Sequence, residues 1–110
     1  MIRSVSEDGL TIGNKTYQTS IAITSGEILD TWCDKAVPEL QEEDFAAVLA
    51  TEPEIIILGT GQSYVFAPRE LVFAFARRNV GLEVMDTKAA ARTFNVLAGE
   101  GRKVAVVLYV

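Results

Sequence analysis

A glycine-rich loop after an apolar run carries the residues of this chain best suited to contact a ligand. Gly59, Thr60 and Gly61 directly follow residues 55–58, which are apolar without alternation. Such a run predicts a strand buried on both faces of an α/β sheet. Glycines after it permit positive φ and close approach of another group. Because ligands bind at the carboxyl ends of strands in open α/β sheets, the loop is a candidate binding site; a tight turn would explain the same glycines.

A second polar segment, Met85, Asp86 and Thr87, ends the predicted strand 81–85 and leads into a helix. Asp86 or Thr87 can cap that helix. If the two strands are neighbours, their loops meet at one rim, where the helix would present free N–H groups to a small anion. A catalytic role for Asp86 would need a partner that shifts its pKa, and the sequence shows none.

Two polar residues of the same helix, Arg92 and Asn95, lie three positions apart and therefore on one face. Asn95 is a poor helix former, which indicates a side-chain hydrogen bond to a nearby loop or a functional contact. We favour the hydrogen bond. Arg92 is either a solvated residue or the charged member of a binding site.

The composition excludes several kinds of chemistry. There is no histidine and a single cysteine, Cys33, so His-based triads, Cys-rich metal sites and disulfides within the chain are not expected. Residues 59–61 fit neither the dinucleotide fingerprint nor the Walker A loop. We therefore predict no catalytic residue, no metal and no cofactor. The net charge of −5 argues against nonspecific nucleic-acid binding.

The N-terminal third is expected to be β-rich and the rest α/β, within one domain of residues 1–110. Residues 9–13 and 17–24 are β-prone runs around a turn at 13–15, and a break at 25–26 precedes a strand at 27–32. In that strand Trp32 shares a side with Ile28, opposite Leu29. Together these runs predict an antiparallel meander over residues 1–36.

Residues 37–110 alternate between strands and helices. Helices are predicted from 41 or 42 to before Pro53, over 68–79, and from 86 or 87 to 97 or 98. Strands are predicted at 54–58, 81–85 and 103–110. Such alternation implies a central sheet with helices packed on it. The expected inward-facing residues of the three helices are Phe45, Val48 and Leu49; Leu71, Val72 and Phe75; and Ala90, Phe94, Leu97 and Ala98.

No apolar run approaches the ~18 residues needed to span a bilayer, and the first residues lack the apolar region of a signal peptide. A soluble, cytoplasmic protein without direct membrane insertion is therefore expected.

Four segments in order, 53–61, 66–68, 81–87 and 90–97, resemble a small α/β domain family. The family includes the mitochondrial complex I assembly factor 3 and the adipogenesis-associated domain protein of animals, and its bacterial members are largely uncharacterised. The resemblance implies a three-layer domain with a central mixed sheet, helices and an N-terminal β layer. It implies no established enzymatic activity. The family's pocket region corresponds here to Gly59, Thr60, Gly61, Met85, Asp86, Thr87, Arg92, Thr93 and Asn95.

The chain departs from the pattern of this family at two positions. Many relatives carry a cysteine just before the Arg-Thr-aromatic-Asn run and often a tyrosine within it. This chain has Ala91 and Phe94 there. A thiol- or phenol-dependent reaction is therefore not expected of it.

Three functions follow as hypotheses. The first is a non-enzymatic interaction or assembly factor with protein partners, among them respiratory-complex subunits or assembly factors. Its candidate contact residues are Trp32, Tyr64, Phe66 and Phe73. The alternative is a small-anion or metabolite-binding domain, possibly an enzyme, with its site at the 59–61 and 86–87 rim. The third is a structural homodimer.

Overall fold

The computed structural model describes residues 2–6, 9–24, 27–33 and 35–110. It contains two sheets. In the smaller one, β1 (Ile2–Ser6), β2 (Gly9–Ile12) and β3 (Lys15–Tyr17) form an antiparallel meander. The larger one has five strands in the order β5-β4-β8-β6-β7. These are β4 (Ile21–Thr24), β5 (Ile28–Thr31), β6 (Ile55–Gly59), β7 (Gly81–Met85) and β8 (Val104–Leu108).

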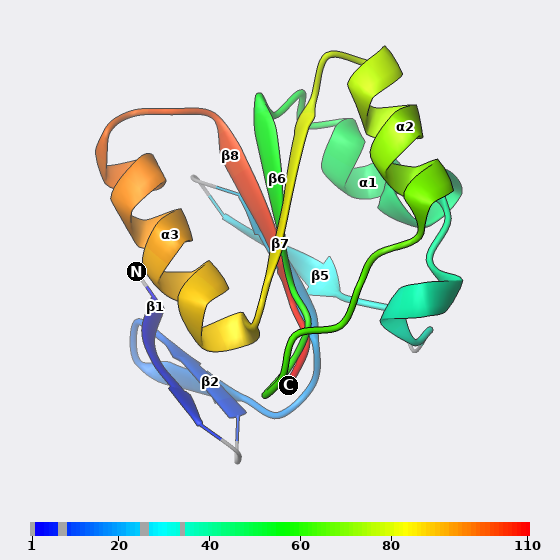
Figure 1. The fold of residues 1–110 in the computed structure, drawn as a ribbon. Helices are drawn as coiled ribbons and strands as arrows, with labels where there is room; N and C mark the ends of the chain where they lie inside the picture. The colour runs from blue at the N-terminus through cyan, green and yellow to red at the C-terminus, as the bar shows by residue number, and fades with distance from the viewer. Residues whose placement is uncertain (1, 7–8, 25–26, 34) are drawn as a thin grey trace.

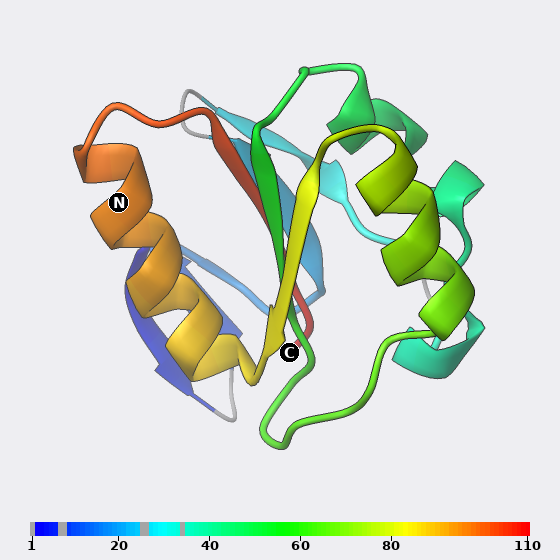
Figure 2. The same ribbon diagram turned by 45° about the horizontal axis from the view of Figure 1, so that its top comes forward.

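The five-stranded sheet is mixed, as the family resemblance implies. β6 pairs in parallel with both β7 and β8, whereas β4 pairs antiparallel with β8 and β5. Helix α3 (Thr87–Gly99) and the small sheet cover one side of it. On the other side lie α1 (Ala46–Leu49) and α2 (Arg69–Arg77), as Figures 1 and 2 show.

Alternate residues of the central strands enter two separate cores. Ile57 and Val106 pack with Phe94 of α3 and with the small sheet. Ile56 and Leu58 pack on the opposite side. The prediction that residues 55–58 form a strand covered on both faces is thereby confirmed.

The predicted helix after Pro38 begins as a 3₁₀ turn. Two such turns, η1 (Val37–Glu39) and η2 (Glu42–Phe45), precede α1. The Asp44 carboxylate accepts a hydrogen bond from the Gln41 N–H (2.8 Å), which closes a capping box. Phe45 and Val48 are buried as predicted.

Three predictions about packing are wrong. The run 17–24 is not one strand, because β3 ends at Tyr17 and β4, with β5, joins the central sheet instead of the meander. Trp32 lies beyond the end of β5 and packs on the same core as Leu29. Val72 of α2 is 41% exposed, and Ala74 takes the inward position. The predicted break at 25–26 lies outside the described residues.

Candidate functional site

The two predicted loops do meet at one rim of the central sheet. Gly59 of β6 is the register partner of Met85 of β7. One residue further on, the Thr60 N–H donates to the Met85 carbonyl (2.9 Å). Both loops therefore leave the sheet side by side at the carboxyl ends of parallel strands, where ligands bind in open α/β sheets.

Thr87 joins the strand ends at this rim. Its side chain is buried, and its hydroxyl accepts a hydrogen bond from the Gly61 N–H (2.8 Å) while donating to the Tyr109 carbonyl (2.7 Å). The Thr87 N–H donates in turn to the Gly61 carbonyl (2.9 Å). One threonine thus connects the segments after β6 and β8 to the start of α3.

The two glycines of the loop have different structural roles. A Cβ on Gly59 would lie 2.9 Å from the Thr87 Cα and 3.0 Å from the Ala90 Cβ, so only glycine allows α3 to pack this closely on β6. Gly61 has φ +103°, which side chains rarely adopt, although a Cβ there would meet nothing within 4 Å. The tight-turn interpretation accounts for Gly61, whereas Gly59 is required by the close approach of α3 to β6.

Thr60 closes the loop that follows. Its hydroxyl donates to the Ser63 carbonyl (2.7 Å) and accepts from the Val65 N–H (3.1 Å). Residues 60–65 are therefore held by one nearly buried side chain at the rim.

The start of α3 is capped by the protein itself. The Asp86 carboxylate accepts a hydrogen bond from the Ala89 N–H (2.9 Å), which confirms the predicted cap. Since the Thr87 N–H is also taken, two of the first amides of the helix are occupied. The carboxylate already supplies negative charge at the positive end of the helix dipole. The helix terminus alone is thus a poorer anion site than the sequence indicated.

Further along α3, Asn95 fixes the first strand. Its amide donates to the Ile2 carbonyl (2.9 Å), and its oxygen accepts from the Ile2 N–H (3.1 Å). The favoured hypothesis of a side-chain hydrogen bond is confirmed, with a strand rather than a loop as the partner. The Thr93 hydroxyl lies 3.5 Å from the Met85 sulfur, as a donor to it, whereas Arg92 is exposed.

Five of the nine predicted site residues line one of two neighbouring hollows. Gly61, Asp86 and Thr87 line a hollow of about 360 Å³ at the rim, together with Tyr109. Arg92 and Asn95 line a smaller hollow of about 160 Å³ between α3 and β1. The other four, Gly59, Thr60, Met85 and Thr93, line neither of them and serve packing or hydrogen bonding.

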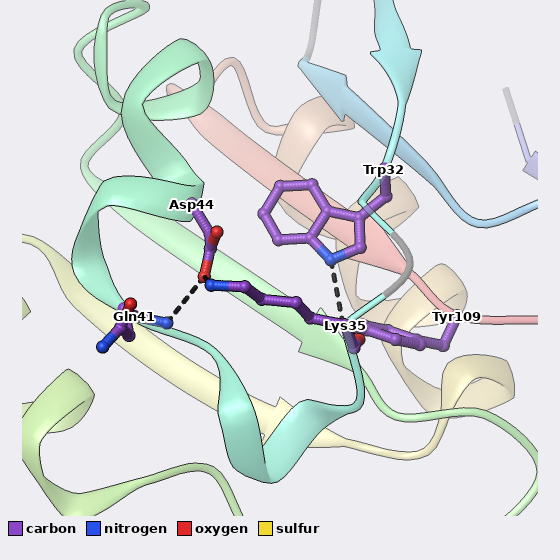
Figure 3. Close-up of polar contacts among 5 residues, drawn as sticks. All are labelled: Trp32, Lys35, Gln41, Asp44 and Tyr109. Atoms are coloured by element: carbon purple, nitrogen blue, oxygen red, sulfur yellow. Dashed lines mark hydrogen bonds and ion pairs between the residues drawn. The ribbon is translucent and has the colours of Figure 1, made fainter.

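A polar network on the α1 side of the sheet was missed by the sequence analysis (Figure 3). The Tyr109 hydroxyl accepts from the Trp32 indole N–H (3.0 Å) and donates to the Lys35 carbonyl (2.7 Å). The Lys35 ammonium lies 3.1 Å from the Asp44 carboxylate, which also caps η2. The one signal of this network in the sequence is the spacing of Gln41 and Asp44, which is typical of a capping box.

Burial and pairing shift three pKa values in this network. Burial raises the pKa of the Tyr109 hydroxyl, against the hydrogen bond from Trp32, which lowers it. The hydrogen bond to Asp44 raises the pKa of Lys35. Desolvation raises the pKa of Asp44. The hydrogen bonds from the Gln41 N–H and from Lys35 outweigh it and bring the pKa below the ordinary value. The network therefore favours a neutral phenol beside a charged Lys–Asp pair.

The described residues include no cluster of three or more His, Cys, Asp or Glu side chains that could hold a metal ion. Within the same residues, no helix is long and apolar enough to cross a membrane.

A mixed five-stranded sheet between α3 and α1–α2, with a rim closed by its own threonines, defines a small three-layer α/β domain. The chain belongs to the family described as "Protein of unknown function (DUF498/DUF598)", whose model matches residues 2–109. An NMR structure of a Xanthomonas campestris protein is 35% identical and superposes with a TM-score of 0.91, covering 100% of this chain and 83% of that one.

Two curated relatives carry names that bear on function or location. NADH dehydrogenase (ubiquinone) 1 alpha subcomplex assembly factor 3 of Mus musculus is 32% identical over 104 residues, which are 92% of this chain and 55% of that protein. The 13 kDa major membrane protein of Francisella tularensis is 28% identical over 94 residues, which are 84% of this chain and 76% of that protein. The chain thus spans about half the length of the assembly factor.

Proposed function

We propose that this protein is a non-enzymatic interaction or assembly factor, and that the loop after β6 presents its partner-binding side chains. The observation that carries the proposal is the exposure of two adjacent aromatic residues on that loop. Phe66 is 77% exposed and Tyr64 is 51% exposed. Their rings contact each other edge to face, with centroids 5.0 Å apart. Exposed aromatic groups of this kind are typical anchors of protein interfaces.

The rim supports this role by fixing the start of the loop. The Thr60 hydroxyl bonds to Ser63 and Val65, next to the aromatic pair. Such anchoring lowers the entropy that an interface loop loses on binding. The residues predicted as a pocket therefore act, in this proposal, mainly as the support of a contact surface.

Of the four contact residues considered from the sequence, three are exposed. Phe73 on α2 is 55% exposed, in addition to Tyr64 and Phe66. Trp32 is half-buried, contacts Phe45 in a tilted arrangement with ring centroids 4.9 Å apart, and donates a hydrogen bond to Tyr109. We therefore assign Trp32 to the core and keep the other three as candidate contact residues.

The similarity to assembly factor 3 supports a protein partner, and respiratory-complex subunits or other assembly factors are the partners that its name suggests. A cytoplasmic location remains part of the proposal.

The test is affinity capture from the soluble and membrane fractions of native lysate, with partners identified by mass spectrometry. Phe66→Ser is the test variant, and Val96→Ser, which replaces a 59% exposed residue of α3, is the matched control. We expect specific partners to be lost with Phe66→Ser and kept with Val96→Ser. Equal capture by both variants and the natural protein would contradict the proposal.

A second candidate function, the binding of a small anion, is favoured by one specific observation. The hollow between α3 and β1 is lined by cationic side chains, Arg92 among them.

A further inference from the structure

Three cationic residues line the small hollow between β1 and α3. Arg3 comes from β1, and Lys88 and Arg92 stand four residues apart on α3. The hollow measures about 160 Å³, and the described residues that line it include no carboxylate. The chain carries 15 acidic and 10 basic residues and is therefore acidic overall. A hollow lined by three cations and, among the described residues, no acid has the opposite charge to the rest of the chain.

These cations have no acidic partner among the described residues. The ion pairs found there are Lys35 with Asp44 and Arg78 with Glu42, both elsewhere in the molecule. The Arg3 guanidinium donates to the Gly13 carbonyl (3.2 Å), a neutral acceptor. Like charges four residues apart on a helix repel each other. An oxyanion between them would replace that repulsion with charge-assisted hydrogen bonds.

The hollow has a fixed frame. Asn95 bonds to both the N–H and the carbonyl of Ile2, which sets the register of β1 against α3. Ile2 is itself buried in the core beside Ala91. The backbone that carries Arg3 is therefore positioned beside the two cations of the helix before any ligand binds, which reduces the cost of ordering.

The hollow adjoins the larger one at the rim. Val5 and Lys88 line both. The rim hollow adds about 360 Å³ between the Gly61 loop and the segment at Tyr109 and Val110. This arrangement matches a ligand with one negatively charged end and a small uncharged body. The charged end would occupy the cationic hollow, and the body would occupy the rim hollow.

We infer that this surface binds a small, soluble organic phosphate, with the phosphate group between Arg3, Lys88 and Arg92 and the body of the molecule in the rim hollow. Three donors carrying positive charge suit a dianionic group with three free oxygens. This inference rests on the second candidate function, the binding of an anion at this hollow, and names its ligand class. It does not depend on the partner-binding function, because Tyr64, Phe66 and Phe73 do not line either hollow.

The test is an NMR titration of ¹⁵N-labelled protein with inorganic phosphate and with phenyl phosphate at constant ionic strength. We expect saturable shifts of the Ser4, Ala91 and Arg92 amides with both probes, and of Gly61 and Val110 only with phenyl phosphate. Arg92→Gln should weaken phenyl phosphate binding about tenfold or more, the typical loss for one charge-assisted contact. Arg69→Gln, an exposed cation of α2, is the matched control and should leave it unchanged.

Three results would overturn the inference. The first is the absence of saturable shifts with either probe. The second is equal weakening by Arg92→Gln and Arg69→Gln, which would indicate nonspecific attraction. The third is binding to phosphatidic-acid vesicles without any response to phenyl phosphate, which would assign the cations to a lipid surface. Phe66→Ser protein should bind phenyl phosphate normally, so failure of this inference and failure of the partner proposal can be told apart.

Discussion

The rim of the central sheet and the network around Tyr109 are two polar clusters built in opposite ways. At the rim, one buried hydroxyl, that of Thr87, connects main-chain groups of Gly61 and Tyr109. In the network, side chains of distant segments meet at a partly exposed surface, where the Lys35 side chain is 41% exposed and that of Asp44 is 13% exposed. Tyr109 belongs to both, by its main chain at the rim and by its hydroxyl in the network.

The two clusters should contribute differently to the free energy of unfolding. A main-chain N–H or carbonyl that loses its partner in a buried place keeps the full cost of desolvation. A partly exposed group can turn to water instead, and an exposed ion pair contributes little. We therefore expect changes at the rim to be the more destabilising, and changes in the network to be smaller and dependent on pH.

The largest effect is expected from Thr87→Val. Valine keeps the shape of the side chain but leaves the Gly61 N–H and the Tyr109 carbonyl without their hydrogen bonds. Losing both should lower the free energy of unfolding by about 2–4 kcal/mol. Urea denaturation followed by circular dichroism measures it.

Thr87→Ser is the control for that change, because it keeps the hydroxyl and removes only a methyl group. It should cost about 1 kcal/mol. If Val and Ser destabilise the protein equally, the hydroxyl does not hold the rim and the contrast between the two clusters fails.

A smaller effect is expected from Tyr109→Phe. The change removes the acceptor of the Trp32 indole and the donor to the Lys35 carbonyl, while the ring stays in place. We expect a loss of about 1–2 kcal/mol, because these groups are only partly buried. Trp32 is the only tryptophan, so the emission of the folded variant reports on this contact, and loss of the indole hydrogen bond should change the emission wavelength. An unchanged spectrum would show that the indole does not bond to Tyr109 in solution.

The smallest effect is expected from Asp44→Asn, and it should depend on pH. The pKa of Asp44 is lowered in the folded protein, so its carboxylate contributes stability above the ordinary value of 3.8 and loses that contribution as the pH falls through the folded value. Denaturation curves of the two proteins should therefore differ at neutral pH and converge in acid. A difference that is constant over this range would exclude the carboxylate charge as its cause.

The rim could be predicted from the sequence because its signals are local. An apolar run followed by glycines, and Asp86 ahead of a helical pattern, indicate two strand ends whatever the rest of the chain does. The hydrogen bonds within the rim could not be predicted. Whether the amides at the start of α3 are free depends on Gly61, which is 26 residues away from Thr87.

The network and the order of the strands could not be predicted either, because both join segments that are far apart in the sequence. Trp32 and Tyr109 are 77 residues apart, and neither carries a local pattern that points to the other. The place of β4 beside β8 is equally non-local. Val72 was predicted to face inward with Leu71 and Phe75, but Ala74 takes that position and Val72 is exposed.

Amide hydrogen exchange at Gly61 tests most directly the claim that the glycine loop is a structural lock held by Thr87. The Gly61 N–H is buried and bonded to the Thr87 hydroxyl, so it should exchange as slowly as the amides of β6 in the natural protein and in Thr87→Ser. In Thr87→Val its exchange should become much faster, while the β6 amides remain slow. Rapid exchange of Gly61 in the natural protein would show an open loop and contradict the account.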